Sequence, residues 1–253
     1  MQIDFNAPYQ QQVDFFKKKL NLPTRTWRDL MRGAHDHAFV VAGAQAADLI
    51  ADLRESVRQA IDEGLTLSSF RAQFDETVAR YGWEYNGGRN WRTKVIYLTN
   101  LRTSHAAGRY QQLSSPAALA ARPYWRYVHS DDVLQPRPLH ESWDNLILPA
   151  DDPWWDTHYP PNDWGCQCRV FSVAKDELPD FNKTQPDSAP DDGSYTHTDP
   201  DGNTTDLPSG VGYGWDYAPG QSRNQSAHFK NDKLARLANR DIDVAKVFKR
   251  LYG

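Results

Sequence analysis

The only two cysteines of this 253-residue chain, Cys166 and Cys168, are separated by a single residue. Thiolates are good ligands for zinc, which structural sites hold with four nitrogen or sulfur donors in a tetrahedron. Side chains two positions apart on an extended segment point to the same face, so both sulfur atoms could reach one ion. The pair therefore suggests a metal site that needs two further donors.

Histidines upstream of the cysteines are the candidates for these donors, and His129 stands just after an expected strand. We expect zinc to be held by four side chains: His140, His158, Cys166 and Cys168. Such a site would join the two ends of an irregular stretch rich in Pro, Asp and Trp. The metal would then stabilise this stretch in place of the hydrophobic core that the stretch lacks. The spacing fits no common zinc finger, so two other interpretations stay open: a pair of partly buried free thiols, and a strained local disulfide.

Catalytic chemistry has weaker support in the sequence. Ser104 and His105 are adjacent, and neighbours on a helix point about 100° apart, so they would not face each other. Pairs of Asp residues surround the histidines, but general acid–base catalysis needs carboxylates placed around a substrate, which the sequence does not reveal. No glycine-rich stretch has the Lys-Ser or Lys-Thr ending of a phosphate-binding loop. We predict no enzyme and no cofactor-binding residues, and keep as the alternative a hydrolase or toxin-like enzyme that uses the His/Asp-rich loop.

The elements that must position these residues indicate an α+β fold. Helical spacing of apolar residues in the first hundred positions predicts a mainly helical N-terminal half. A helix is expected over about 91–113, followed by strands near 124–128 and 168–173 with a long irregular stretch between them. Residues 175–207 look like acidic loop. The second half is thus predicted to be a small, loop-rich, β-containing domain whose core zinc could stabilise.

Composition limits the classes of protein to which this chain could belong. The net charge of −4 argues against a protein dedicated to coating DNA, although residues 223–253 carry eight bases and three acids. No long apolar run predicts a membrane-spanning helix, and no basic-then-apolar N-terminal segment predicts a secretory signal. We therefore expect synthesis in the cytoplasm and no membrane partner. Five of the nine tryptophans lie close to the cysteines, as a local core or a binding surface: Trp125, Trp143, Trp154, Trp155 and Trp164.

Several motifs in order resemble the phage Mu F-like minor head proteins, also called head morphogenesis proteins. Residues 35–74 resemble the N-terminal part of that family, and residues 96–113 its central helix. The strongest likeness is residues 122–170, with an aromatic strand, an Asp-containing turn, a basic-Pro-x-His element, an acidic Pro-Trp stretch and a Pro-Pro…Cys-x-Cys-Arg ending. GWDYAPG, residues 214–220, resembles a further element in which Ala218 replaces an expected Asn.

The resemblance implies a division of the chain into three parts. Residues 1–90 would be an N-terminal helical region, 91–222 the Mu F-like head morphogenesis domain, and 223–253 a basic helical tail. It also implies that His140, Cys166 and Cys168 belong to the structural core of the domain. The tail leaves no room for the toxin or nuclease domain that some relatives carry, so we expect no enzymatic passenger.

The resemblance also implies a role in a virus particle. The protein would be a minor capsid protein of a tailed bacteriophage or prophage, made in the bacterial cytoplasm and placed inside the head near the portal vertex. Its expected partners are the portal protein and the major capsid protein, with DNA as a further partner of the basic tail. There it would support head assembly and DNA packaging or ejection.

Overall fold

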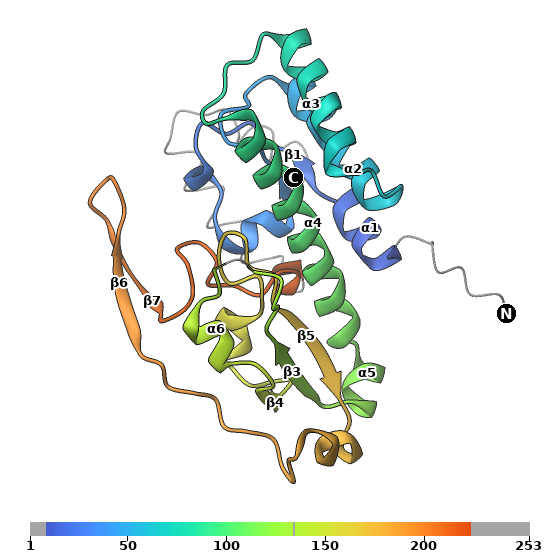
Figure 1. Ribbon diagram of the computed structural model, residues 1–253, viewed down its shortest axis with the longest axis vertical. Coiled ribbons are helices and arrows are strands. Elements are labelled where there is room, and N and C mark those ends of the chain that lie inside the picture. Colours follow the sequence, from blue (N-terminus) through green and yellow to red (C-terminus); the bar gives the residue numbers. More distant parts are fainter. Residues whose placement is uncertain (1–8, 134, 224–253) are drawn as a thin grey trace, which may run out of the picture.

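The computed structural model describes residues 9–133 and 135–223 of the chain. All of the predicted basic tail after Arg223 therefore lies outside the described residues. The fold is α+β, as expected: helices dominate the first half, and small sheets follow (Figure 1). The helices are α1 (Gln10–Lys17), α2 (Ala47–Asp62), α3 (Leu67–Tyr81), α4 (Arg89–Leu113), α5 (Pro116–Ala121), α6 (Pro138–Ser142) and α7 (Trp155–His158). The strands are β1 (Leu20–Asn21), β2 (Ala38–Phe39), β3 (Tyr124–Val128), β4 (Ile147–Pro149), β5 (Arg169–Val173), β6 (Ser194–Thr198) and β7 (Thr204–Pro208).

The helical part is built from amphipathic helices with defined ends. Thr66 caps α3 by accepting a hydrogen bond from the backbone N–H of Ser69, and Gly82 ends it in the left-handed conformation. The apolar side of α2 recurs every three to four residues and faces the core. That core includes Phe16, Phe39, Leu53, Val57, Phe70, Phe74 and Ile96.

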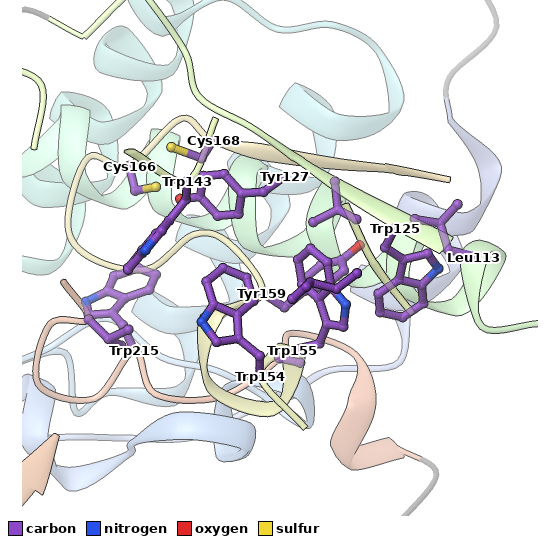
Figure 2. Close-up of a cluster of buried hydrophobic side chains, with 14 residues drawn as sticks. Leu113, Trp125, Tyr127, Trp143, Trp154, Trp155, Tyr159, Cys166, Cys168 and Trp215 are labelled. Carbon is purple, nitrogen blue, oxygen red and sulfur yellow. The ribbon is translucent and has the colours of Figure 1, made fainter. Parts of the chain in front are cut away.

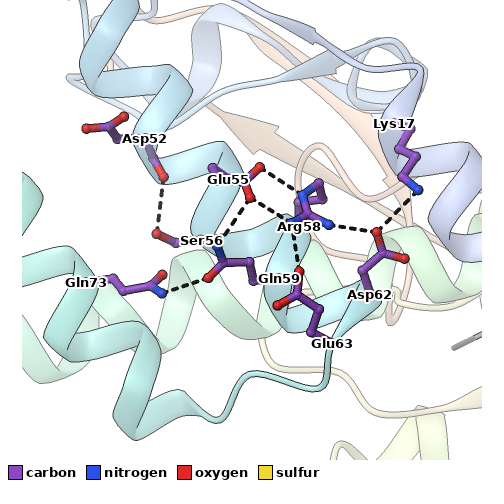
Figure 3. Close-up of polar contacts among 9 residues, drawn as sticks. All are labelled: Lys17, Asp52, Glu55, Ser56, Arg58, Gln59, Asp62, Glu63 and Gln73. Carbon is purple, nitrogen blue, oxygen red and sulfur yellow. Dashed lines mark hydrogen bonds and ion pairs between the residues drawn. The ribbon is translucent and has the colours of Figure 1, made fainter. Parts of the chain in front are cut away.

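A polar network ties α2 to its neighbours on the outer surface (Figure 3). Arg58 forms ion pairs with Glu55, Asp62 and Glu63 along or just beyond the same helix. Asp62 also pairs with Lys17 of α1 at 3.3 Å. Because the outer groups of the network, on Lys17, Glu55 and Glu63, are about half exposed to solvent, it contributes less to stability than the phenylalanine core beneath it.

The long helix α4 connects the helical part with the sheet, running along the molecule in Figure 1. It packs against α1, α2 and α3 of the helical part and against β5 of the sheet. The predicted limit between residues 90 and 91 falls in the first turn of this helix. Among the described residues, no helix combines the length and apolar character needed to cross a membrane.

The central sheet has the strand order β4-β3-β5, and both pairings are antiparallel. Strand β3 alternates, with Trp125 and Tyr127 buried and their neighbours partly exposed, which is the pattern of a strand with one face on a core. The two predicted strands are thus present, at 124–128 and 169–173. Their pairing is the frame on which the cysteines are placed.

Two stretches expected to be irregular contain regular elements. Between β3 and β5 the chain forms α6, β4 and α7, each only three to five residues long. In the segment expected to be acidic loop, β6 and β7 form an antiparallel hairpin. Four of the five residues of β6 are exposed and Leu207 is the one buried residue of β7, so the hairpin lacks the strong apolar alternation by which a strand is found in a sequence.

Candidate metal-binding site

Strand pairing brings the first of the site residues together. In the antiparallel register of β3 and β5, Val128 lies opposite Arg169. The next positions outward are His129 and Cys168, which therefore face each other at the end of the ladder. The Sγ atom of Cys168 lies 3.6 Å from Nδ1 of His129.

His140 approaches the cysteines from α6. Its Nδ1 atom lies 3.8 Å from Sγ of Cys166 and 3.8 Å from Sγ of Cys168. The three ligand atoms all lie within 4.8 Å of one another, and all three residues are buried. The structure thus brings together three of the four predicted ligands, and these three could hold a metal ion.

A backbone carbonyl fixes the ring of His140. Its Nε2 atom lies 2.8 Å from the carbonyl oxygen of Gly210, an acceptor, so Nε2 carries the proton and donates. The Nδ1 atom that faces the sulfur atoms is then left with its lone pair, as a metal ligand requires. A histidine whose second nitrogen is held in this way is the usual arrangement at metal sites.

The two thiols are coupled through one proton. A hydrogen bond from the Cys168 thiol lowers the pKa of Cys166 well below its usual value, and the same bond raises the pKa of Cys168. Both cysteines are free, so the local disulfide left open by the sequence is not formed. The lowered pKa of Cys166 favours its thiolate, which is the form of cysteine that binds a metal.

Aromatic rings enclose the site, and the two sulfur atoms lie beside Trp143 and Tyr127 (Figure 2). Trp143 stacks on His140, with ring centroids 5.2 Å apart. Of the five tryptophans near the cysteines, Trp143 and Trp155 are both buried. Trp154 is buried too, whereas 42% of the Trp164 surface is exposed. The aromatic groups thus form a small core beside the cysteines, which holds the candidate ligands away from water.

His158 occupies a different position in this core. Its ring stacks on Trp154 with centroids 4.3 Å apart, and its edge meets Trp143. Its Nδ1 atom lies 3.0 Å from the carbonyl oxygen of Trp154, and burial lowers the pKa of His158 to about 4. The structure does not bring His158 into the group of three ligand atoms, and the residue it places against Cys168 instead is His129.

The candidate catalytic residues are held in structural contacts. Ser104 is fully buried, and its hydroxyl donates to the carbonyl oxygen of Asn100 at 2.6 Å. Asp152 accepts a hydrogen bond from the backbone N–H of Trp154 at the start of α7. The buried carboxylate of Asp36 was not singled out in the sequence, and no motif there marks its place in the core.

Residues 51–171 match the family model described as Phage Mu protein F like protein. The matched stretch begins in α2, ends in β5 and contains all of the candidate metal ligands, so this part of the chain is similar to the Mu F-like family, as its motifs predicted.

Two curated proteins are similar to the chain. "Putative capsid assembly protein F" of Escherichia phage Mu is 35% identical over 181 residues, which are 66% of this chain and 40% of that protein. "Mu-like prophage FluMu F protein" of Haemophilus influenzae is 35% identical over 163 residues, which are 60% of this chain and 38% of that protein. The chain thus spans about two fifths of the length of these relatives. No solved structure matches it.

Proposed function

We propose that this protein is a minor capsid protein of a tailed bacteriophage or prophage that acts by binding and not by catalysis. The observation that carries the proposal is the Mu F-like family match over residues 51–171. A relative named for capsid assembly, at 35% identity, supports the same role in head assembly. The contacts of Ser104 agree with a structural role, since its hydroxyl is committed to the backbone of its own helix.

The proposed position of the protein within the head is near the portal vertex, and its proposed main partner is the portal protein. Its surface offers large apolar side chains for such a contact: Trp91 is 58% exposed, Trp164 42% and Trp27 40%. Trp27 packs edge-on against Trp164, and all three line one cavity of about 370 Å³. Tryptophans are enriched among the residues that dominate binding energy at protein interfaces, which supports this face as the one that binds.

Co-sedimentation of the purified chain with portal rings tests this role. We expect binding by wild type and a loss of at least tenfold in affinity for Trp91→Ala combined with Trp164→Ala, since hot-spot truncation costs about 2 kcal/mol or more. Phe171→Ala is the matched control, because Phe171 is 40% exposed but does not line that cavity. A chain that binds neither portal nor major capsid protein, and that mass spectrometry does not find in virions, would refute the proposal.

DNA is proposed as a partner of the basic segment 223–253. The argument for it is the excess of five positive charges in those residues, since phosphate contacts by Lys and Arg dominate affinity for nucleic acid. Binding of duplex DNA should weaken steeply as salt rises from 50 to 200 mM and should be lost in a chain truncated after residue 222. Binding that persists without this segment would show that residues 223–253 do not bind the DNA, and no binding by the full chain would remove DNA from the list of partners; neither result bears on the portal contact.

Zinc is proposed as a structural cofactor at His140, Cys166 and Cys168. The support is the three convergent buried ligand atoms and the free Nδ1 lone pair of His140. When bound, zinc would stabilise a domain whose elements between β3 and β5 are very short. Its expected role is to hold the binding surface in shape.

A further inference from the structure

We propose that His129 is the fourth ligand and that His129, His140, Cys166 and Cys168 form a closed two-cysteine, two-histidine zinc site. The inference rests on the proposed structural zinc at the same place and goes beyond it by naming the complete ligand set. It follows from the strand register, in which Val128 pairs with Arg169 and His129 and Cys168 are the next positions, and from the 3.6 Å between Sγ of Cys168 and Nδ1 of His129. The sequence alone favoured His158 instead.

Three sulfur–nitrogen distances match those that zinc imposes on its ligands, although His129 lies near Cys168 alone and outside the group of three mutually close ligand atoms. Zinc–sulfur bonds of about 2.3 Å and zinc–nitrogen bonds of about 2.0–2.1 Å in a tetrahedron place neighbouring ligand atoms about 3.5–3.8 Å apart. The sulfur–nitrogen separations are 3.6 Å for Cys168 with His129, and 3.8 Å for His140 with each cysteine. The ion would require His129 to swing from Cys168 toward the centre of the group.

The backbone around His129 is already held in place for this. Its N–H donates to the Oδ1 atom of Asp144 at 2.9 Å, and the strand that precedes it pairs on both sides. The ring is partly exposed, so it can turn by side-chain rotation alone without disturbing the core. These features fix the backbone of His129 and leave its imidazole ring free to rotate.

His158, the rival fourth ligand, has its ring committed elsewhere. Stacking on Trp154 and the hydrogen bond from Nδ1 to the Trp154 carbonyl oxygen hold it within the aromatic core. Bringing it to the sulfur atoms would break the stack and leave that carbonyl without this donor. His129 reaches the site at no such cost.

A site closed by four protein ligands is structural, because no position remains for water or substrate. It would join the end of β3, the helix α6 and the loop that leads into β5. Through the hydrogen bond from His140 it would also hold the turn at Gly210, which follows the β6–β7 hairpin. One ion would thereby fix four segments that share little regular structure.

Metal content and affinity of the full-length purified chain test the ligand set. Wild type from zinc-supplemented cultures should contain one zinc per chain, and His140→Ala should contain almost none. His129→Ala should lose at least tenfold in zinc affinity, measured by competition with a chromogenic chelator. His158→Ala is the matched control and should keep wild-type zinc content and affinity, although its lost stacking lowers the melting temperature.

Cobalt substitution identifies the ligands without relying on affinity. The wild-type Co²⁺ form should show the visible spectrum of a tetrahedral site with two thiolates. His129→Cys should retain a folded, metal-loaded chain and show stronger sulfur-to-cobalt charge transfer, which also covers the case in which His129→Ala fails to fold. An unchanged cobalt spectrum in this variant would overturn the assignment of His129.

The outcomes distinguish two claims: that the protein binds zinc, and that His129 is the fourth ligand. Wild type that carries no zinc and gains no stability from added zinc overturns both the cofactor and its ligand set. Zinc bound with unchanged affinity in His129→Ala, or lost equally in His158→Ala, overturns His129 alone. Neither result bears on portal binding, which is measured separately.

Discussion

The carboxylate of Asp36 accepts a hydrogen bond from the backbone N–H of Gly220 at 2.8 Å, although the two residues are 184 positions apart. The hydroxyl of Ser222 donates to the same oxygen at 2.7 Å. Asp36 is only 1% exposed, so this charged group depends on such partners. The contact ties the N-terminal helical region to the GWDYAPG element near residue 220, and the two parts are thereby stabilised together.

Replacing Asp36 by Ala should therefore destabilise the whole fold. The change leaves the N–H of Gly220 without its acceptor in a buried place, and we expect a loss of about 2–4 kcal/mol in the free energy of unfolding. Ser222→Ala removes one donor only and should cost about 1 kcal/mol. Urea denaturation followed by tryptophan fluorescence measures both. Equal costs for the two variants would mean that Asp36 does not organise this contact.

Tyr127 offers a second test, inside the aromatic core. Its hydroxyl donates to Oδ1 of Asn162 at 2.9 Å, and both residues are completely buried. Tyr127→Phe leaves that oxygen without its donor, so we expect the free energy of unfolding to fall by about 1–3 kcal/mol.

The matched control for that change is Tyr159→Phe. Tyr159 is also buried, but its hydroxyl has no hydrogen-bond partner among the described residues. Removing a buried polar group that lacks a partner should be neutral or slightly stabilising. The two variants delete the same atom from the same core, and chemical denaturation that finds equal losses would contradict the role assigned to Asn162.

A pH experiment tests the ion pair that joins the end of α5 to the segment after β5. The hydrogen bond from Arg122 lowers the pKa of Glu177 below its usual 4.5. A carboxyl with a lowered pKa stabilises the fold at neutral pH, and that contribution disappears as the pH falls through its pKa in the folded protein.

Glu177→Gln should therefore melt at a slightly lower temperature than wild type at pH 7. The two melting temperatures should converge between about pH 4.5 and pH 3, because wild type loses its charge there. Glu76→Gln is the control, an exposed acid of α3 that takes part in none of the ion pairs found in the described part of the chain. A constant difference at every pH would show that charge is not the cause.

Strong periodic patterns made the main elements predictable. The apolar stripe of α2, the Thr66 cap and the Gly82 end are local signals, and the structure has each of them. The alternation around Trp125 and Tyr127 likewise located β3. Such features depend on near neighbours in the chain, so a sequence reveals them.

The set of metal ligands depends on how two strands that are far apart in the sequence pair with each other. Their register cannot be read from the sequence. Two strands near 124–128 and 168–173 were expected, but their register was not, and a shift of two residues would move His129 away from Cys168. His158 looked favourable because it is close to the cysteines in the chain. Its role in stacking on Trp154 follows from the tertiary packing alone.

The crossing of α1 and α4 provides the last prediction. A Cβ atom built on Gly108 would lie 2.9 Å from the backbone nitrogen of Gln12 and 3.0 Å from the Cε1 atom of Tyr9. The backbones approach too closely for a methyl group, so Gly108→Ala should cost about 1–3 kcal/mol through overpacking, despite the better helix propensity of Ala. Gly88→Ala is the control, because its Cβ would meet nothing within 4 Å and its backbone is extended. Ala is a poorer N-cap than Gly but also restricts the unfolded chain, and because these effects oppose each other the control should change stability by less than about 1 kcal/mol. Thermal or urea denaturation that finds Gly108→Ala as stable as wild type would show that α1 can shift on α4 without loss.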